Sequence, residues 1–311
     1  METKKILRRP SLERYKQQAD ALLKRIKSGH LQELQRLKKW HPHIGKLPDS
    51  ELQRTKPGLS DAQLVIAREH AFETWSTFAK HLKGLSRNNS PISKFESAVD
   101  AVVTGQIVKL KRMLRADPGL VRRRSTRLHH ATLLNYVGAN GVEDYRQKTP
   151  KNVVEVAEIL LKAGADIRAI ADLYGGSDTL GLAATSIFPC RAGVQNALID
   201  ILIKYGADLN EAGLVNGCLR NGRGQAAEHL AKRGVRLDLE GAAGTGQLDV
   251  VKAFFTKDGR LKAGATGMRL HLGVRVRPDP SGRVSAADGT ECRRGTLRNN
   301  RPALGGIHRA R

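Results

Sequence analysis

The sequence predicts an all-α protein, in which a small helical region is followed by a solenoid of repeated helix-turn-helix units. Apolar residues recur at helical spacing through most of residues 11–255. Segments with the same order of glycine, polar and aliphatic residues return several times along the chain. Aromatic residues make up only 4% of the chain, which is low for the core of a β-sandwich or barrel and ordinary for a helical array.

The helical region is predicted over residues 1–91. Residues 11–29 have the pattern of one amphipathic helix, with Ser11 as its N-cap. Residues 59–85 predict two more helices, and the polar segment 84–93 marks the end of the region. The last of these helices carries an apolar stripe that we expect to be core: Phe72, Trp75, Phe78 and Leu82.

The repeat array is predicted over residues 92–267. Thr104–Asp117 (TGQIVKLKRMLRAD) and Thr245–Asp258 (TGQLDVVKAFFTKD) share Thr-Gly-Gln, then an aliphatic residue, then apolar positions at helical spacing. Val153–Ile167 and Val194–Asn210 are amphipathic helices that each stop at a glycine followed by Ala-Asp, where a left-handed cap is expected. These copies predict stacked units that share one apolar core.

The copies resemble the ankyrin repeat. The first-helix motif of that family, Thr-Pro-Leu-His-x-Ala, is present in degraded form as Thr132–Val137 (TLLNYV) and Thr179–Ala184 (TLGLAA). Asn135 and Gly181 stand where the motif has His, so we expect weaker hydrogen bonding between neighbouring units. Residues 1–91 resemble the N-terminal extension of some bacterial ankyrin-repeat proteins, which implies no activity.

The spacing of the units departs from that family. Gly164 and Gly206 are 42 residues apart, against ~33 for a standard unit, which predicts an inserted turn at residues 186–193. We expect four units between about residues 93 and 263, with one further candidate copy at 20–42. The resemblance implies a non-enzymatic scaffold with a concave surface and projecting finger loops.

The stretch EGAAGTGQLDVVKAFF, residues 240–255, also resembles a phosphate-binding loop, because three glycines precede an apolar helix. Such a loop follows a buried strand and continues as G-x-G-x-x-G or ends in Gly-Lys-Ser/Thr. The preceding residues 234–239 are short and charged, and no Lys-Ser/Thr follows Gly246. We therefore interpret the glycines as the turn of a repeat unit.

A candidate partner-binding surface lies in the predicted finger loops. RRRSTRLHH, residues 122–130, is the densest basic cluster of the array, and IADLYGGSD, residues 170–178, occupies the next loop. Arginine suits carboxylates and phosphates through its planar fork, whereas the alternative is that both loops are merely solvated. The candidate residues are Arg122, Arg123, Arg124, Arg127, Asp172, Tyr174 and Asp178.

The sequence gives no positive indication of an enzyme. No Ser/His/Asp or Cys/His arrangement can be placed by a motif, so no catalytic or cofactor-binding residue is predicted. The histidine pairs at 41/43 and 129/130 have no cysteine or carboxylate at zinc spacing, so no metal site is predicted.

Charge and cysteine content narrow the expected partners. The net charge of +24 favours an acidic protein, with non-specific nucleic acid as the alternative through the basic termini. Three cysteines without a paired pattern, and no apolar stretch after the basic N-terminus, predict a cytoplasmic protein that does not engage a membrane. The oligomeric state is not readable.

The C-terminal segment 268–311 breaks the pattern. It carries ten arginines, no lysine and three acidic residues, and its helical periodicity stops. This composition is typical of a disordered basic tail or of a shifted reading frame in a GC-rich gene. Since nothing periodic follows Phe255 to cover the last apolar stripe, we expect the final unit to fray or to self-associate.

Overall fold

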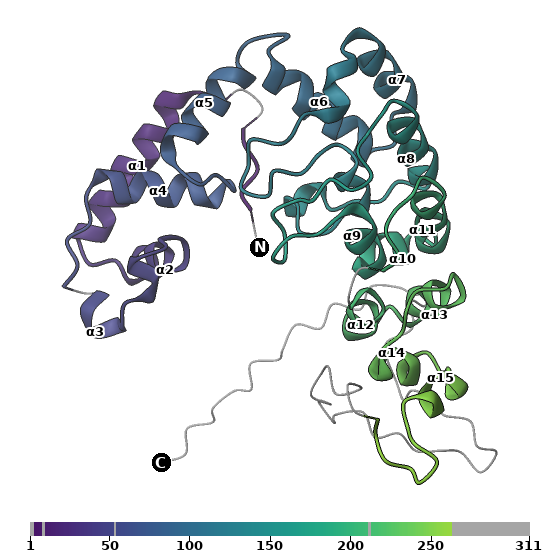
Figure 1. Ribbon diagram of the computed structural model, residues 1–311. Coiled ribbons are helices and arrows are strands. Elements are labelled where there is room, and N and C mark those ends of the chain that lie inside the picture. Colours follow the sequence, from purple (N-terminus) through teal and green to yellow (C-terminus); the bar gives the residue numbers. More distant parts are fainter. Residues whose placement is uncertain (1–2, 8–9, 53, 211–212, 263–311) are drawn as a thin grey trace, which may run out of the picture.

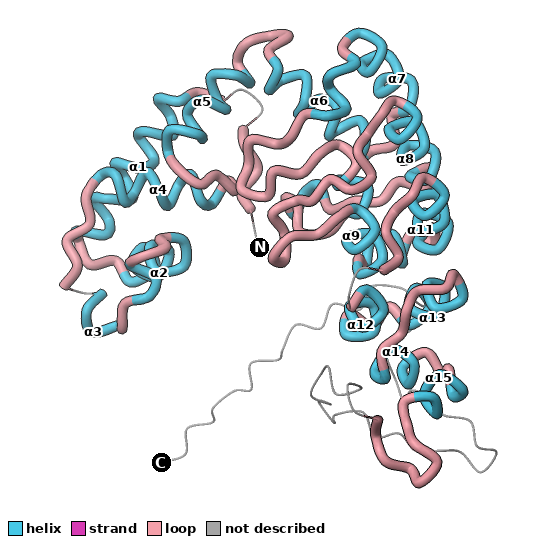
Figure 2. The backbone as a smooth tube through the Cα atoms, viewed as in Figure 1, coloured by secondary structure: helices cyan, strands magenta, loops and turns pink. Residues whose placement is uncertain are grey.

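A computed structural model describes residues 3–7, 10–52, 54–210 and 213–262. The predicted tail at 268–311 lies outside the described residues. The chain forms an arch, with the N-terminal helices in one limb and the repeated helices in the other (Figure 1). Helices form the outer layer of the second limb, and its loops project toward the inside of the arch (Figure 2). Among the described residues every regular element is a helix; loops connect the helices, and strand-type pairing is limited to three isolated β-bridges.

The N-terminal limb has a hydrophobic core of its own. In this core the buried ring of Phe78 packs against the rings of Tyr15 and Phe72. Trp75 is half-buried at the edge of this core and opens the last helix, so Phe72 lies in the turn before that helix and not within it. The helices are α1 (Leu12–Lys27), α2 (Leu31–Trp40), η1 (Ile44–Lys46), α3 (Asp49–Leu52), α4 (Leu59–Glu69) and α5 (Trp75–Leu85).

The candidate repeat copy at residues 20–42 belongs to this limb. It spans the end of α1 and all of α2, and both helices pack against α4. Leu34 and Leu37 of α2 are buried in the N-terminal core, and neither residue joins the core of the array. The segment is therefore part of the helical region, and the array begins at α6.

The second limb is a series of helix pairs with one continuous core that runs from Phe95 to Val235. Each pair packs on the next along the limb, as α9 does on α12 and α12 on α14. The elements are α6 (Pro91–Val103), α7 (Ile107–Ala116), η2 (Pro118–Arg122), η3 (Asn135–Gly138), η4 (Asp144–Arg146), α8 (Val153–Lys162), α9 (Thr179–Thr185), α10 (Ile187–Arg191), α11 (Gln195–Lys204), α12 (Leu214–Arg220), α13 (Gly224–Lys232), α14 (Leu239–Gly244) and α15 (Leu248–Ala253).

The glycines of residues 241–246 serve helix packing and turning. Gly241 and Gly244 lie inside α14, and a Cβ on Gly244 would lie 2.3 Å from Leu219 Cδ1, so the glycine allows α12 and α14 to approach closely. Gly246 has a left-handed φ of +70° in the turn that leads to α15, a conformation that favours glycine. The residues before α14 form no strand, which agrees with the repeat interpretation.

Asn135 ties two neighbouring units together, contrary to the expected weakening of their hydrogen bonds. Its buried Nδ2 donates to Ala169 O and to Thr179 Oγ1, both at 3.0 Å. Its Oδ1 accepts from the backbone N–H of Thr132 at 2.8 Å. The expectation was wrong at this position because the amide supplies both a donor and an acceptor where the motif has His.

The insertion predicted as a turn at residues 186–193 contains a short helix, α10. Ser186 caps it by accepting a hydrogen bond from Phe188 N–H, and the Ser186 hydroxyl donates to Ala139 O at 3.0 Å. Gln195 of α11 donates to the carbonyls of Ala183, Ala184 and Ser186. These bonds attach the extra residues to the preceding unit.

Candidate protein-binding surface

Two loops on the inner side of the arch carry the predicted candidate residues. Loop A (residues 123–131) follows η2, and loop B (residues 168–178) follows α8 (Figures 1 and 2). Isolated antiparallel bridges close each loop at its base, between Arg124 and Thr132 in the first and between Ala171 and Ser177 in the second. Each loop is therefore a short hairpin-like projection.

Hydrogen bonds hold loops A and B side by side. The backbone N–H of Asp172 donates to His129 O at 2.8 Å. Arg124 Nη1 donates to Ile170 O at 2.6 Å and to His130 O at 3.0 Å, so one guanidinium bridges both loops. His130 Nδ1 lies 2.7 Å from Asp172 Oδ2. The pair of loops is thus ordered before any partner arrives.

Loop B presents apolar side chains to solvent, Tyr174 near its tip and Ile170 at its base. Tyr174 is 72% exposed and Ile170 is 48% exposed. The Tyr174 hydroxyl donates to Asn140 Oδ1 at 2.9 Å, which fixes the orientation of the ring. A Cβ at Gly141 would lie 3.0 Å from Tyr174 Cε2, so the missing side chain leaves the room that the ring occupies.

Tyr174 has a left-handed backbone, with φ of +54°, and His130 in loop A has φ of +45°. A bulky residue in this region costs free energy, and such residues persist where the surroundings over-determine them. Here the surroundings are the cross-loop bond to Asp172 and the anchor on Asn140. Strained residues at both tips mark loops A and B as a candidate functional surface.

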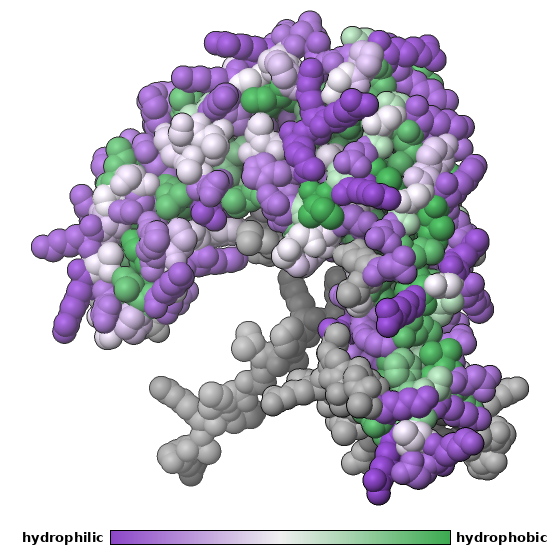
Figure 3. Space-filling model, in the orientation of Figure 1, coloured by the Kyte–Doolittle hydropathy of each residue, from purple (hydrophilic) through white to green (hydrophobic). Residues whose placement is uncertain are grey.

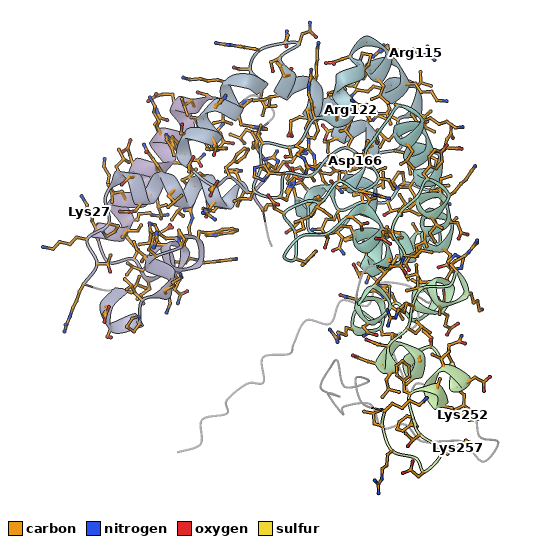
Figure 4. All side chains as sticks on the ribbon, in the orientation of Figure 1. Lys27, Arg115, Arg122, Asp166, Lys252 and Lys257 are labelled. Atoms are coloured by element: carbon orange, nitrogen blue, oxygen red, sulfur yellow. The ribbon has the colours of Figure 1, made fainter. Side chains whose placement is uncertain are left out.

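Arg122 and Arg123 lie at the base of loop A. Arg122 is exposed, and its Nη2 lies 3.9 Å from the position that a Cβ on Gly164 would take; Figure 4 shows the side chain of Arg122. Arg123 Nη1 forms an ion pair with Asp117 Oδ2 at 2.8 Å and is half-buried. Arg122, Arg124, Asp172 and Tyr174 are the candidate residues that are exposed.

Arg127 occupies the interior, although it belongs to the same basic cluster. Its side chain is 2% exposed, and it forms ion pairs with Glu143 and, at 3.1 Å, with Glu96 Oε2. Arg146 donates to Glu96 Oε2 at 2.6 Å and to Glu143 Oε1 at 3.0 Å. We call these four residues the junction network. Arg127 therefore leaves the set of candidate partner-binding residues, because it has no surface to offer.

The charges of the junction network compensate one another. Burial alone would raise the pKa of Glu143, but Arg127 holds that pKa well below its usual range. Burial acts in the same way on Glu96, and Arg127 and Arg146 together lower its pKa. Both carboxylates are therefore ionised at neutral pH, and each neutralises a buried guanidinium.

The junction network also fixes loop A to the N-terminal limb. Arg127 Nη1 donates to His70 O at 3.2 Å, and its guanidinium lies 5.1 Å from the ring centre of Phe72. The backbone N–H of Leu128 donates to Ala71 O at 2.8 Å. His81 Nδ1 lies 2.7 Å from Thr126 Oγ1. The position of loop A therefore depends on residues of both limbs.

Sequence reasoning missed Glu96, Glu143 and Arg146, which come together from α6, the loop after η3, and η4. One signal was present, because Glu96 interrupts the otherwise apolar face of residues 91–103. A carboxylate on a buried helix face requires a cationic partner. The partner's position was not readable, because it lies 31 residues away in the chain.

Asp178 is also committed to an internal role. It is buried and caps α9, where its Oδ1 accepts from Gly181 N–H at 2.8 Å. This bond satisfies one of the free backbone donors of the helix start. Asp178 is therefore not part of the exposed surface of loop B.

A surface cavity of about 590 Å³ lies elsewhere, between α2, residues 3–4 and Asp144. Its lining includes Glu69, whose carboxylate pairs with Lys4 and Arg36. The lining also includes Thr3 and Asp144, and it contains no His, Cys or Ser. Within the described ranges, no group of three or more His, Cys, Asp or Glu could hold a metal ion.

Comparison with protein-family models, curated proteins and solved structures finds no match to this chain. In the part of the chain that the structure describes, no helix has the length and apolar character needed to cross a membrane.

Proposed function

We propose that this protein is a non-enzymatic scaffold, an ankyrin-like array that binds a partner protein through loops A and B. One observation carries the proposal. Tyr174 and Ile170 are exposed on loop B, and hydrogen bonds between loops A and B already hold the two loops in place. Binding then costs little conformational entropy, because the loops need no further ordering. A cytoplasmic location is part of the proposal and rests on the sequence alone, because Cys190 is disulfide-bonded in the structure and gives that location no support.

Tyr174 has the properties of a binding anchor. Tyrosine, tryptophan and arginine dominate the residues that carry most of the binding energy in protein interfaces. Tyr174 offers a rigid ring whose hydroxyl is already satisfied by Asn140. The exposed arginines, Arg124 in loop A and Arg122 at the end of η2 just before it, favour an acidic partner.

A photo-cross-linking amino acid at position 174 of the full-length chain, expressed in cells, tests the proposal. We expect a specific protein adduct from position 174 and none from position 108 on the outer helix α7, where Val108 is 84% exposed. Tyr174→Ala should then weaken binding of that protein by about 2 kcal/mol or more, whereas Val108→Ala should not. Equal adducts from both positions would refute the proposal.

The second candidate function is binding of nucleic acid or another polyanion through the basic termini. The observation that favours it is the net charge of +24, with ten arginines in residues 268–311. Such binding is expected to be non-specific and to weaken steeply with salt. If a chain without residues 268–311 still bound one DNA sequence tightly, sequence-specific nucleic-acid binding would rank above protein binding as the function.

A further inference from the structure

The described part of the array ends in α15, whose apolar side chains are exposed or half-buried. No residue of α15 is buried, whereas α13 buries Ala226, Ala227 and Leu230. The array core ends at Val235, so α15 packs on α14 without joining that core. Leu248 is 46% exposed, and the other apolar side chains of this end are half-buried: Val250, Val251, Phe254 and Phe255.

In a stacked array each unit covers the apolar face of the unit before it. Here α14 packs on α12 and on α15, and the described chain ends soon after α15. Apolar surface is visible among the polar side chains along this limb (Figure 3). The α15 end therefore presents the kind of surface that elsewhere in the array is covered by another helix pair.

The same end is rimmed by cations. Lys252 and Lys257 are exposed at this end of the arch (Figure 4), and neither forms an ion pair within the described residues. Lys262 Nζ donates to the carbonyl of Ala253 at 2.8 Å. Arg260 pairs with Asp258, which leaves Asp249 as the one other carboxylate of residues 245–262. The rim therefore has a net positive charge.

We propose that the α15 end of the array is a docking surface for an acidic amphipathic helix of a partner protein. The apolar stripe of such a helix would cover Leu248 and the half-buried Phe254 and Phe255. Its carboxylates would lie against Lys252 and Lys257. This surface is separate from loops A and B and does not depend on the function proposed for them.

The positive charge of the α15 end disfavours two other occupants of this surface, a second copy of the chain and the chain's own residues 263–311. A second copy would bring the same lysines to the interface, and like charges opposed across an interface cost free energy. Residues 263–311 carry ten arginines against three acidic residues, so they too would oppose cation to cation. An acidic helix is the occupant that both the apolar stripe and the rim favour.

A matched pair of synthetic helical peptides tests this inference on the full-length chain. Both peptides have leucine at positions i, i+3, i+4 and i+7, and the remaining positions are glutamate in one and lysine in the other. Fluorescence anisotropy should show binding of the glutamate peptide, and hydrogen exchange should slow in residues 239–262. A double Lys252→Glu/Lys257→Glu variant should weaken this binding by about tenfold and should gain affinity for the lysine peptide.

The control is Lys24→Glu/Lys27→Glu, which makes the same charge change on exposed lysines of α1. Equal weakening by the control variant, or equal binding of both peptides, would overturn the proposal. Absence of binding, as expected if residues 263–311 cover this end, would also overturn it. If analytical ultracentrifugation shows a dimer of the parent chain and a monomer of the Leu248→Asp variant, the surface binds a second copy and the proposal is wrong.

Discussion

Arg127 and Arg124 lie three positions apart in one basic cluster, yet they have opposite roles. Arg124 is exposed and bridges loops A and B through two carbonyls. Arg127 is buried between two carboxylates and the backbone of the N-terminal limb. The sequence predicted the cluster and its place in a loop. It could not separate the two arginines, because the carboxylates that bury Arg127 come from α6 and from the loop after η3.

Arg127→Ala should destabilise the protein strongly. It leaves Glu96 and Glu143 buried with one guanidinium between them, and breaking a buried ion pair by removing one partner costs about 3–5 kcal/mol. The free energy of unfolding from urea titration measures this loss. Arg115→Ala, at an exposed position of α7, is the control and should change stability by about 0.5 kcal/mol or less.

Stability should fall as the pH is lowered from 7 toward 4. Burial lowers the pKa of His70 and of His81 from 6.5 to about 4, so both are neutral in the folded chain. The unfolded chain binds protons below pH 6.5 that the folded chain does not, and this favours unfolding. The lowered pKa of Glu143 acts in the same direction below its usual value of 4.5.

Urea titrations at several pH values measure this dependence. In the His81→Gln variant the loss of stability between pH 6.5 and pH 4.5 should be smaller than in the parent chain. A free energy of unfolding that stays constant or rises on acidification in this window would contradict the buried, neutral state of His70 and His81.

At the scale of elements, glycine signals and amphipathic stripes predicted the helix ends well. Gly164 and Gly206 follow α8 and α11 with left-handed φ, as expected from their place before Ala-Asp. Residues 186–193 were predicted as a turn, and α10 within them was missed because five residues are too few to show a period. The bonds of Asn135 were missed because they depend on Ala169 and Thr179 of the next unit.

Asn135→Ala should loosen the contact between neighbouring units. The substitution leaves the buried carbonyl of Ala169 without the donor that it has now, which costs about 1–3 kcal/mol. Thermal unfolding measures the loss, and Gln32→Ala on the exposed face of α2 is a matched amide control. An unchanged melting temperature in Asn135→Ala would show that the amide does not fasten the units.

At the scale of the whole molecule, the two limbs of the arch form one unit because charged and polar groups cross between them. Arg127 and Leu128 bond to the backbone of residues 70–71, and residues 3–4 bond to both limbs through Glu69 and Asp144. Composition and periodicity separated the limbs at residue 91. They did not predict that residues of both limbs hold loop A in place, because the contacts between loop A and the N-terminal limb connect residues far apart in the chain.

The central claim is that loops A and B form an ordered surface before any partner binds, and amide hydrogen exchange of the free chain tests it most directly. The amides of Leu128 and Asp172 donate to Ala71 O and His129 O. We predict that both exchange about 100-fold or more slowly than in an unstructured peptide, as expected for bonds that break only on local opening. Exchange of both amides at the unprotected rate would contradict the claim.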